Sequence, residues 1–248
     1  MKNNNSIYLI LLVLFVLVGW QFAVGLFNLN KTLYPTLISV FTSIFGADNL
    51  FLDLQISLLR LLSGSIIGII IGILFGVITG HFSKINETFG KFTNFFRFIP
   101  PLALVPLFLL WFGIGESSKI GLLAWSCFFP VWISTYNGVK NLENKYCFVA
   151  KSLDLKGFYF IREVLFKGSL DYILNGARIG IGIAFSVLIA AEMIGAYAGL
   201  GYRIFFLQSV YRVDMMIAYI IILGILGVII DRSFVLISKK LTPWKNDE

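Results

Sequence analysis

One acidic residue stands alone within a long apolar stretch of this sequence. Glu192 is the only Asp, Glu, Lys or Arg between positions 179 and 202. An ionisable side chain inside a membrane is costly, so it marks either a functional group or one half of a buried ion pair. Arg60, at the edge of an earlier apolar stretch, is the candidate partner. A residue of a transport pathway and a structural ion pair between helices are both consistent with this pattern.

The sequence offers little material for other chemistry. His81 is the only histidine, and Cys127 and Cys147 are the only cysteines, too few for a cysteine-based metal site or a disulfide framework. The Gly-x-x-x-x-Gly-Lys-Ser/Thr motif of nucleotide-binding loops does not occur. We therefore expect no catalytic residue, no metal site and no cofactor in this chain.

The elements that must position Glu192 and Arg60 are apolar stretches of membrane-spanning length. The chain is 58% hydrophobic and 13% charged, whereas soluble domains carry about 25% charged residues. A helix needs roughly 20 apolar residues to cross a bilayer. The uncharged runs predict an all-α membrane protein with six transmembrane helices, near 7–26, 58–80, 95–113, 119–138, 177–198 and 215–237. The first is expected to be an uncleaved anchor, because its apolar run exceeds that of a signal peptide.

The distribution of basic residues predicts the orientation. With the N-terminus inside, most of the 20 Lys and Arg residues fall in inside segments, as the positive-inside rule requires. Both termini should then be cytoplasmic in a multi-pass protein of the inner (plasma) membrane. The net charge of +7 is assigned to this anchoring and not to nucleic-acid binding.

The spans suggest a division of the chain into three parts. Residues 1–56 form an N-terminal anchor helix and an external segment, with a short helix expected within 27–57. Residues 57–240 form the core, which includes a long inside loop at 139–176. Residues 241–248 form a cytoplasmic tail.

Two spans have unusual small or helix-breaking residues. Five glycines recur at a spacing of four in the second span: Gly64, Gly68, Gly72, Gly76 and Gly80. Such a ridge lets a neighbouring helix approach closely, either as plain packing or as a surface for sliding during gating. The third span carries Pro100, Pro101 and Pro106. Prolines kink helices, and broken helices in membranes occur where protein or a water-filled cavity covers them.

The inside loop is more than a connector. Residues 146–155 alternate apolar and charged side chains at roughly helical spacing, Gly157 interrupts the pattern, and 158–166 is a second amphipathic piece. An amphipathic helix of this kind can lie on the membrane surface or dock a cytoplasmic partner.

Several motifs in order resemble the binding-protein-dependent ABC importer permeases of the nitrate, sulfonate and taurine group. The resemblance covers about 57–240. The motifs are 57–60 (SLLR), 96–103 (FRFIPPLA), 105–107 (VPL), 111–119 (WFGIGESSK), 128–130 (FFP), 175–178 (NGAR), 190–195 (AAEMIG) and 199–201 (GLG). It implies the type I importer transmembrane fold.

In these permeases the long cytoplasmic loop holds the EAA motif, a helix that sits in a cleft of the ATPase. The resemblance assigns ATPase coupling to Phe148, Val149, Ala150, Lys151, Ser152, Leu153, Asp154 and Gly157, with Ala150 facing the cleft. The pattern departs from the family's: Phe148 replaces Glu, Asp154 replaces Gly, and Phe166-Lys167 replaces Leu-Pro.

The resemblance also implies the function and the partners. The chain would be the permease subunit of an ATP-binding-cassette importer for a small solute of the nitrate, taurine or alkanesulfonate type. Its partners would be two ATPase subunits that hold ATP and Mg²⁺, a second copy of the permease, an external or periplasmic solute-binding protein, and membrane lipid. The alternatives are a permease for a thiamine-precursor pyrimidine or riboflavin, an ATPase-independent secondary transporter, and a membrane scaffold.

Overall fold

The computed structural model describes residues 4–27, 30–47, 49–142 and 144–243. Residues 244–248, most of the expected C-terminal tail, lie outside the described residues. The described residues form helices and connecting turns, with no β-strand among them. The expected all-α class is therefore confirmed.

The helices differ widely in length. In chain order they are α1 (Asn4–Leu26), α2 (Leu37–Phe45), α3 (Leu50–His81), α4 (Ser83–Phe96), the 3₁₀ turn η1 (Pro101–Leu104), α5 (Val105–Phe112), α6 (Glu116–Lys140), α7 (Asn144–Ser152), α8 (Gly157–Phe160), the π-helical η2 (Ile161–Phe166), α9 (Leu170–Gly195), α10 (Leu200–Ser209) and α11 (Val213–Leu241). The short helix expected within 27–57 is α2.

Three of the described helices, α3, α9 and α11, are long and apolar enough to cross a membrane. This supports a multi-pass membrane protein. Each extends beyond its predicted span, since α3 begins at Leu50, α9 begins at Leu170 and α11 continues to Leu241. The full count of six spans stays a prediction.

The third predicted span, near 95–113, is broken into separate helices. Helix α4 ends at Phe96, and the chain resumes as η1 and then α5. Pro100 has an extended conformation (φ −62°, ψ 123°), which the ring of Pro101 imposes on the residue before it. Pro106 falls in the first turn of α5, where a missing N–H does no harm. The prolines thus end one helix and start another, and do not merely kink one.

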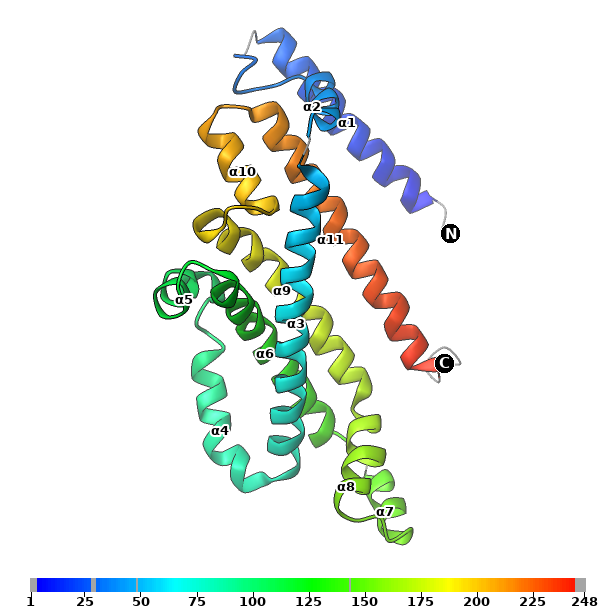
Figure 1. The fold of residues 1–248 in the computed structure, drawn as a ribbon. Helices are drawn as coiled ribbons and strands as arrows, with labels where there is room; N and C mark the ends of the chain where they lie inside the picture. The colour runs from blue at the N-terminus through cyan, green and yellow to red at the C-terminus, as the bar shows by residue number, and fades with distance from the viewer. Residues whose placement is uncertain (1–3, 28–29, 48, 143, 244–248) are drawn as a thin grey trace.

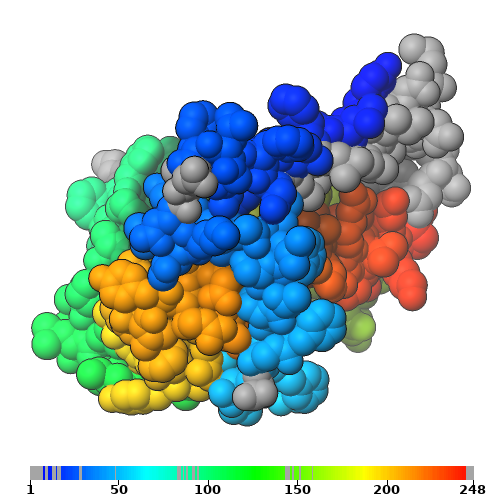
Figure 2. Space-filling view, turned by 90° about the horizontal axis from the view of Figure 1, so that it is seen from above, coloured from blue at the N-terminus to red at the C-terminus, as the bar shows by residue number. Residues whose placement is uncertain are grey.

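The long helices form an elongated bundle (Figure 1). Helix α3 packs along α6, and α6 packs along α9. One end of the bundle carries α2 and α10, and the opposite end carries α7 and α8. We call these the α10 end and the α7 end. Helix α11 packs against α2, α9 and α10. Figure 2, which looks down on the α10 end, shows the residues around α10 (orange) next to the blue N-terminal segment.

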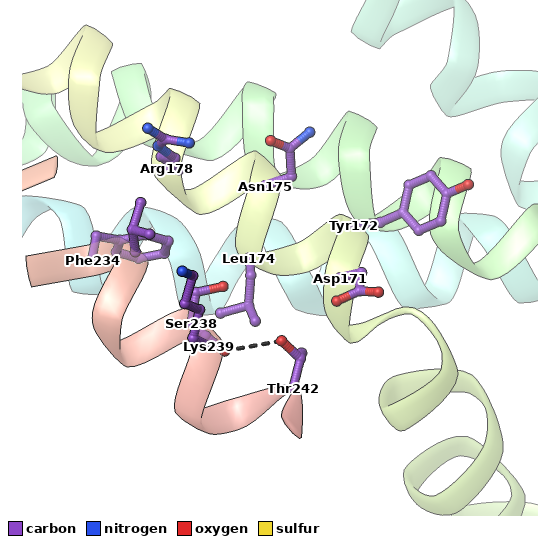
Figure 3. Close-up of a pocket in the computed structure, with 10 residues that line it drawn as sticks. Asp171, Tyr172, Leu174, Asn175, Arg178, Phe234, Ser238, Lys239 and Thr242 are labelled. Carbon is purple, nitrogen blue, oxygen red and sulfur yellow. Dashed lines mark hydrogen bonds between the residues drawn. The ribbon is translucent and has the colours of Figure 1, made fainter. Parts of the chain in front are cut away.

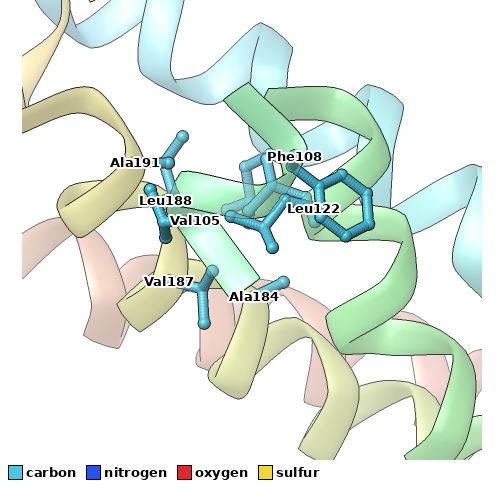
Figure 4. Packing of buried hydrophobic residues seen from close by; sticks show 9 residues of the cluster. Val105, Phe108, Leu122, Ala184, Val187, Leu188 and Ala191 are labelled. Carbon is cyan, nitrogen blue, oxygen red and sulfur yellow. The ribbon is translucent and has the colours of Figure 1, made fainter. Parts of the chain in front are cut away.

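An apolar core joins the broken segment to the bundle. Figure 4 shows Val105 and Phe108 of α5 packed with Leu122 of α6 and with Ala184 and Leu188 of α9. All five side chains are buried. The chain is thus anchored in the core at α5, whereas Pro100 at the break is exposed and Pro101 is half-buried.

The five glycines of the predicted ridge all lie against α6. A Cβ atom added at Gly68 would stand 2.4 Å from the carbonyl oxygen of Ala124, and one at Gly72 would stand 2.8 Å from the Cβ of Val131. Added Cβ atoms at the other three positions, Gly64, Gly76 and Gly80, would also approach α6 atoms to 2.4–2.7 Å. The ridge therefore lets the two helix backbones approach closely. A sliding motion stays a prediction.

Candidate functional site: an ion-pair cluster at the α10 end

Charged side chains from four helices meet near the α10 end of the bundle. We call the group the ion-pair cluster. Its members are Asp53, Ser57 and Arg60 of α3, Glu116 and Lys119 of α6, Glu192 of α9, and Arg203 of α10. Three acids and three bases make the cluster neutral overall.

Glu192 lies at the centre of the cluster and is fully buried. Its Oε1 accepts a hydrogen bond of 2.9 Å from Nη1 of Arg60. The hydroxyl of Ser57 lies 2.8 and 2.9 Å from the two carboxylate oxygens. The backbone N–H of Gly201 donates to Oε2 at 2.9 Å. The partnership of Glu192 with Arg60 that the sequence suggested is thus present, and its role in transport stays a prediction.

Arg60 bridges two acids. Its Nε donates to Oε2 of Glu116 at 2.6 Å, and its Nη2 donates to Oε1 of the same carboxylate at 2.5 Å. Its Nη1 donates to Glu192 and to the carbonyl of Ala198, the latter at 2.7 Å. Such fork-shaped pairing of guanidinium with carboxylate fixes both groups in orientation. The guanidinium therefore ties the start of α6 to the end of α9.

A second ion pair connects α3 to α10. Nε of Arg203 donates to Oδ2 of Asp53 at 2.8 Å, and the Asp53 side chain is fully buried. The backbone N–H of Gly199 donates to Oδ1 of Asp53 at 3.0 Å. The hydroxyl of Tyr219 on α11 lies 3.4 Å from Oδ2. Both carboxylate oxygens thus have donors, as burial requires.

The end of the turn after α9 and the start of α10 supply three consecutive backbone donors. The N–H groups of Gly199, Leu200 and Gly201 donate to Asp53, Ser57 and Glu192 respectively. Gly199 has φ +119°, a conformation that favours glycine. A Cβ at Gly199 would stand 2.5 Å from Oε1 of Glu192. Glycine is therefore required here for both backbone conformation and space.

The loop at the α7 end holds the residues assigned to ATPase coupling. Helix α7 ends at Ser152. Asp154 (φ 53°) in the turn that follows and Gly157 (φ 58°) at the start of α8 adopt left-handed conformations. Phe148 is 72% exposed, Val149 55% and Leu153 67%. Exposed apolar side chains in such number indicate a surface that another molecule covers. The Lys151 side chain lies outside the described part of the structure.

The assignment of Ala150 to a partner's cleft stays a prediction. Ala150 is only 2% exposed in this chain alone. It lines a cavity of about 740 Å³ between α7 and the η2–α9 segment, together with Val149, Leu153 and Val164. Helix α7 therefore turns Ala150 toward its own chain. Val149 and Leu153 border the same cavity but stay more than half exposed, and Phe148 lies outside it. On the far wall of this cavity, the Lys167 ammonium donates to Glu163 and lowers the pKa of that carboxyl.

A further cavity of about 690 Å³ lies between the ends of α9 and α11 nearest α7. Figure 3 shows Asn175 and Arg178 of α9 across from Phe234 and Lys239 of α11. Arg178 is held by Asp231, with Nε donating to Oδ1 at 2.6 Å. The cavity is open and lined by residues of two helices, so its shape depends on how these helices pack.

The comparison with known proteins decides the family. Residues 68–243 match the binding-protein-dependent transport system inner membrane component. The chain belongs to this family. A putative ABC transporter permease protein of Methanocaldococcus jannaschii is 37% identical over 210 residues, which cover 84% of this chain and 79% of the relative. The putative aliphatic sulfonates transport permease protein of Bacillus subtilis is 35% identical over 241 residues, covering 96% and 87%. The taurine transport system permease protein of Escherichia coli is 36% identical over 152 residues, covering 61% and 55%.

The family motifs in this permease converge on the ion-pair cluster. Segments 57–60, 111–119, 190–195 and 199–201 each contribute at least one group to it. Sequence reasoning singled out Arg60 and Glu192 but did not assign Ser57, Glu116 or Lys119 to the same site. It missed Asp53 and Arg203, which lie outside these motifs. The feature of the sequence that could have revealed Asp53 and Arg203 is that each is a charged residue beside an apolar stretch.

Among the residues that the structure describes, no group of three or more His, Cys, Asp or Glu side chains could hold a metal ion. The cluster holds charged groups of four helices in fixed orientations at one end of the bundle.

Proposed function

We propose that this chain is the membrane-spanning permease subunit of an ATP-driven importer for small sulfonates, such as alkanesulfonates or taurine. The family match over residues 68–243 carries the permease assignment. The solute class rests on the names of the relatives, one of which aligns with 96% of this chain. The permease itself catalyses no covalent step, and its cofactors, ATP and Mg²⁺, are proposed to reside on the partner ATPase.

The proposed architecture is the type I importer fold with six spans. The three apolar helices supply three spans, α1 and α6 supply two more, and the broken α4–η1–α5 segment supplies the sixth. We keep the division into an N-terminal part (1–56), a core (57–240) and a C-terminal tail (241–248). The α7 end is then cytoplasmic with both termini, and the α10 end faces outward.

Cysteine labelling tests this topology. With Cys127 and Cys147 replaced, a cysteine at Ser117 should react with a membrane-impermeant maleimide in intact cells, because Ser117 lies near the α10 end. A cysteine at Ser152 should react only after permeabilisation. Reaction of both cysteines under the same condition would contradict the proposed orientation.

The proposed partners follow from the permease role. Two ATPase subunits would bind at the α7 end, a solute-binding protein would bind at the α10 end, and a second copy of this chain would complete the pathway within membrane lipid. Alternating access would be driven by the difference in affinity of the loop for the ATPase states.

The exposed side chains Phe148, Val149 and Leu153 are the proposed contact with the ATPase. Leu153→Arg should place a charge in that interface without disturbing the loop, because Leu153 is 67% exposed. Burying an unpaired charge is costly, so we expect at least a tenfold loss of ATPase co-purification and a matching loss of uptake. Tyr159→Arg, also in the loop and 66% exposed, is the matched control and should retain both. Full retention in Leu153→Arg would contradict the assignment.

Ala150→Arg should behave differently from Leu153→Arg. Because Ala150 is buried against its own chain, the larger side chain should destabilise the loop itself. Limited proteolysis of the variant in membranes should show faster cleavage within 141–169. Unchanged proteolysis together with lost ATPase binding would instead indicate that Ala150 contacts the ATPase directly.

The solute class is tested through the partner binding protein. The binding protein that co-purifies with this permease should bind an alkanesulfonate or taurine in calorimetry. Binding of a pyrimidine precursor of thiamine, or of riboflavin, would favour the alternative importer class.

An ATPase-independent secondary transporter is the second candidate. It needs ionisable groups along the spans that exchange protons or ions. In the described residues, the buried acids Asp53 and Glu192 both have basic partners at one end of the bundle. This arrangement favours the importer.

A further inference from the structure

A third cavity, of about 520 Å³, opens beside the ion-pair cluster. It lies between α3, the start of α6 and the turn after α9. Its lining includes Arg60, Ser63, Glu116, Lys119 and Tyr197. Small-molecule sites commonly have volumes of about 300–1,000 Å³, so the cavity can hold a small organic solute. An exposed carboxylate and two cations in the wall are incompatible with contact to hydrocarbon, so the cavity faces water.

The two cations of this cavity are buried, whereas the acid that joins them is not. The side chains of Arg60 and Lys119 are 6% and 4% exposed, and that of Glu116 is 57% exposed. Burial in the chain fixes the positions of both cations. The Glu116 side chain can therefore rotate into solvent without disturbing the packing of buried residues.

The two sides of the Arg60 guanidinium have different partners: buried groups on one side and an exposed carboxylate on the other. The Nη1 side is fixed by buried Glu192 and by the carbonyl of Ala198. Among the described residues, the fork formed by Nε and Nη2 is occupied by the exposed carboxylate of Glu116 alone. The ammonium of Lys119 donates to the carbonyl of Gly115 at 2.9 Å and lies 3.7 Å from Oε1 of the same carboxylate. Glu116 therefore occupies a preformed site for an oxyanion.

The charges of the cluster show what could replace this carboxylate. Arg203 and Asp53 neutralise one another, and Glu192 neutralises one of the two remaining cations. Departure of Glu116 leaves one uncompensated positive charge at the cavity wall. A monoanion with coplanar or tetrahedral oxygens restores neutrality and presents two acceptors to the fork of Arg60.

We infer that this cavity binds the sulfonate group of the solute, which displaces Glu116 from Nε and Nη2 of Arg60, with Lys119 donating to a third oxygen. The organic part of the solute then lies against Ile56, Leu59 and Tyr197 of the cavity wall. Glu116 acts as an internal competitor that closes the site when it is empty. This inference rests on the proposed function, because that function supplies the solute class.

Direct binding to the assembled permease–ATPase complex in nanodiscs, without the binding protein, tests the site. The probe is ethanesulfonate, and ethylammonium of matched size is the control ligand. Glu116→Gln should raise the affinity for ethanesulfonate about tenfold, because an internal competitor lowers apparent affinity by the fraction of closed sites. Lys119→Met should lower it about tenfold, the scale of one charge-assisted hydrogen bond. Ethylammonium should show neither change.

Asp214→Asn is the matched control variant. Asp214 also pairs with an arginine, Arg212, at 3.1 Å, but Arg212 is exposed where Arg60 is buried, and the pair lies outside the cavity. Its loss should leave ethanesulfonate affinity unchanged. If Glu116→Gln fails to accumulate, Ser63→Phe replaces it, because a large side chain there fills the cavity and should abolish binding.

The possible results distinguish a failure of the proposed binding site from a failure of the proposed function. Equal affinities of wild type, Glu116→Gln and Lys119→Met, no binding of ethanesulfonate to wild type, or unchanged binding in Ser63→Phe would overturn the site. ATP-dependent uptake of ethanesulfonate by the complete importer would persist in those cases if the proposed function is right. Absence of that uptake, with the expected affinity changes intact, would overturn the solute assignment and leave an anion site.

Discussion

Gly72→Leu should prevent assembly of the helix bundle. The added Cβ alone would stand 2.8 Å from the Cβ of Val131 and 2.9 Å from the carbonyl oxygen of Phe128. Neither neighbour is the free end of a flexible side chain, so α3 and α6 must move apart. Overpacking of this kind costs about 1–3 kcal/mol when the core can adjust, and separation of two long helices should cost more. We expect little folded permease in the membrane, measured by monodispersity after detergent extraction.

Gly182→Leu provides the matched control. Gly182 lies on α9, and a Cβ at this position would meet nothing within 4 Å. The same chemical change should therefore leave the amount of folded permease near that of wild type. Wild-type amounts of the Gly72 variant would show that α3 and α6 are not packed as described.

Glu192→Gln should destabilise the permease by on the order of 3 kcal/mol, the scale for removing one partner of a buried ion pair. Glu192 accepts hydrogen bonds from Ser57, Arg60 and the N–H of Gly201. Without its charge, the cluster carries an excess positive charge in a buried site. The free energy of unfolding in mixed micelles and the rate of uptake should both fall. Asp214→Asn, which disrupts the exposed pair with Arg212, should cost less than about 1 kcal/mol.

The double mutant separates pairing from independent roles. If Arg60 and Glu192 act as a pair, Arg60→Gln combined with Glu192→Gln should cost less than the sum of the two single changes, by about 0.5–3 kcal/mol. Costs that add fully would contradict the pairing and leave Glu192 as a local hydrogen-bonding group.

Helix class and the glycine contact face could be predicted from the sequence, because both depend on local spacing. The four-residue repeat from Gly64 to Gly80 predicts one continuous face, and the structure places that face on α6. The place of the break in the third span could not be predicted in the same way, since apolar content alone does not show where Pro100 and Pro101 end a helix. Beyond the break, α5 is held by its packing on α6 and α9, which depends on the tertiary fold.

The ion-pair cluster was only partly predictable. Glu192 was found because it interrupts an apolar run. Glu116 and Asp53 lie at helix starts, where acids are common for reasons unrelated to function. Their convergence depends on the crossing of α3, α6 and α9, which no local pattern encodes. The burial of Ala150 likewise depends on how α7 folds back onto the η2–α9 segment.

ATP-dependent uptake in proteoliposomes tests the central claim most directly. The permease is reconstituted with its co-purified ATPase and binding protein, and accumulation of radiolabelled taurine or ethanesulfonate is measured. We predict that accumulation requires ATP on the side of the membrane where the ATPase lies and the binding protein on the opposite side. We also predict that accumulation requires an intact Leu153. Accumulation by the permease alone, driven by an ion gradient and indifferent to ATP, would contradict the account.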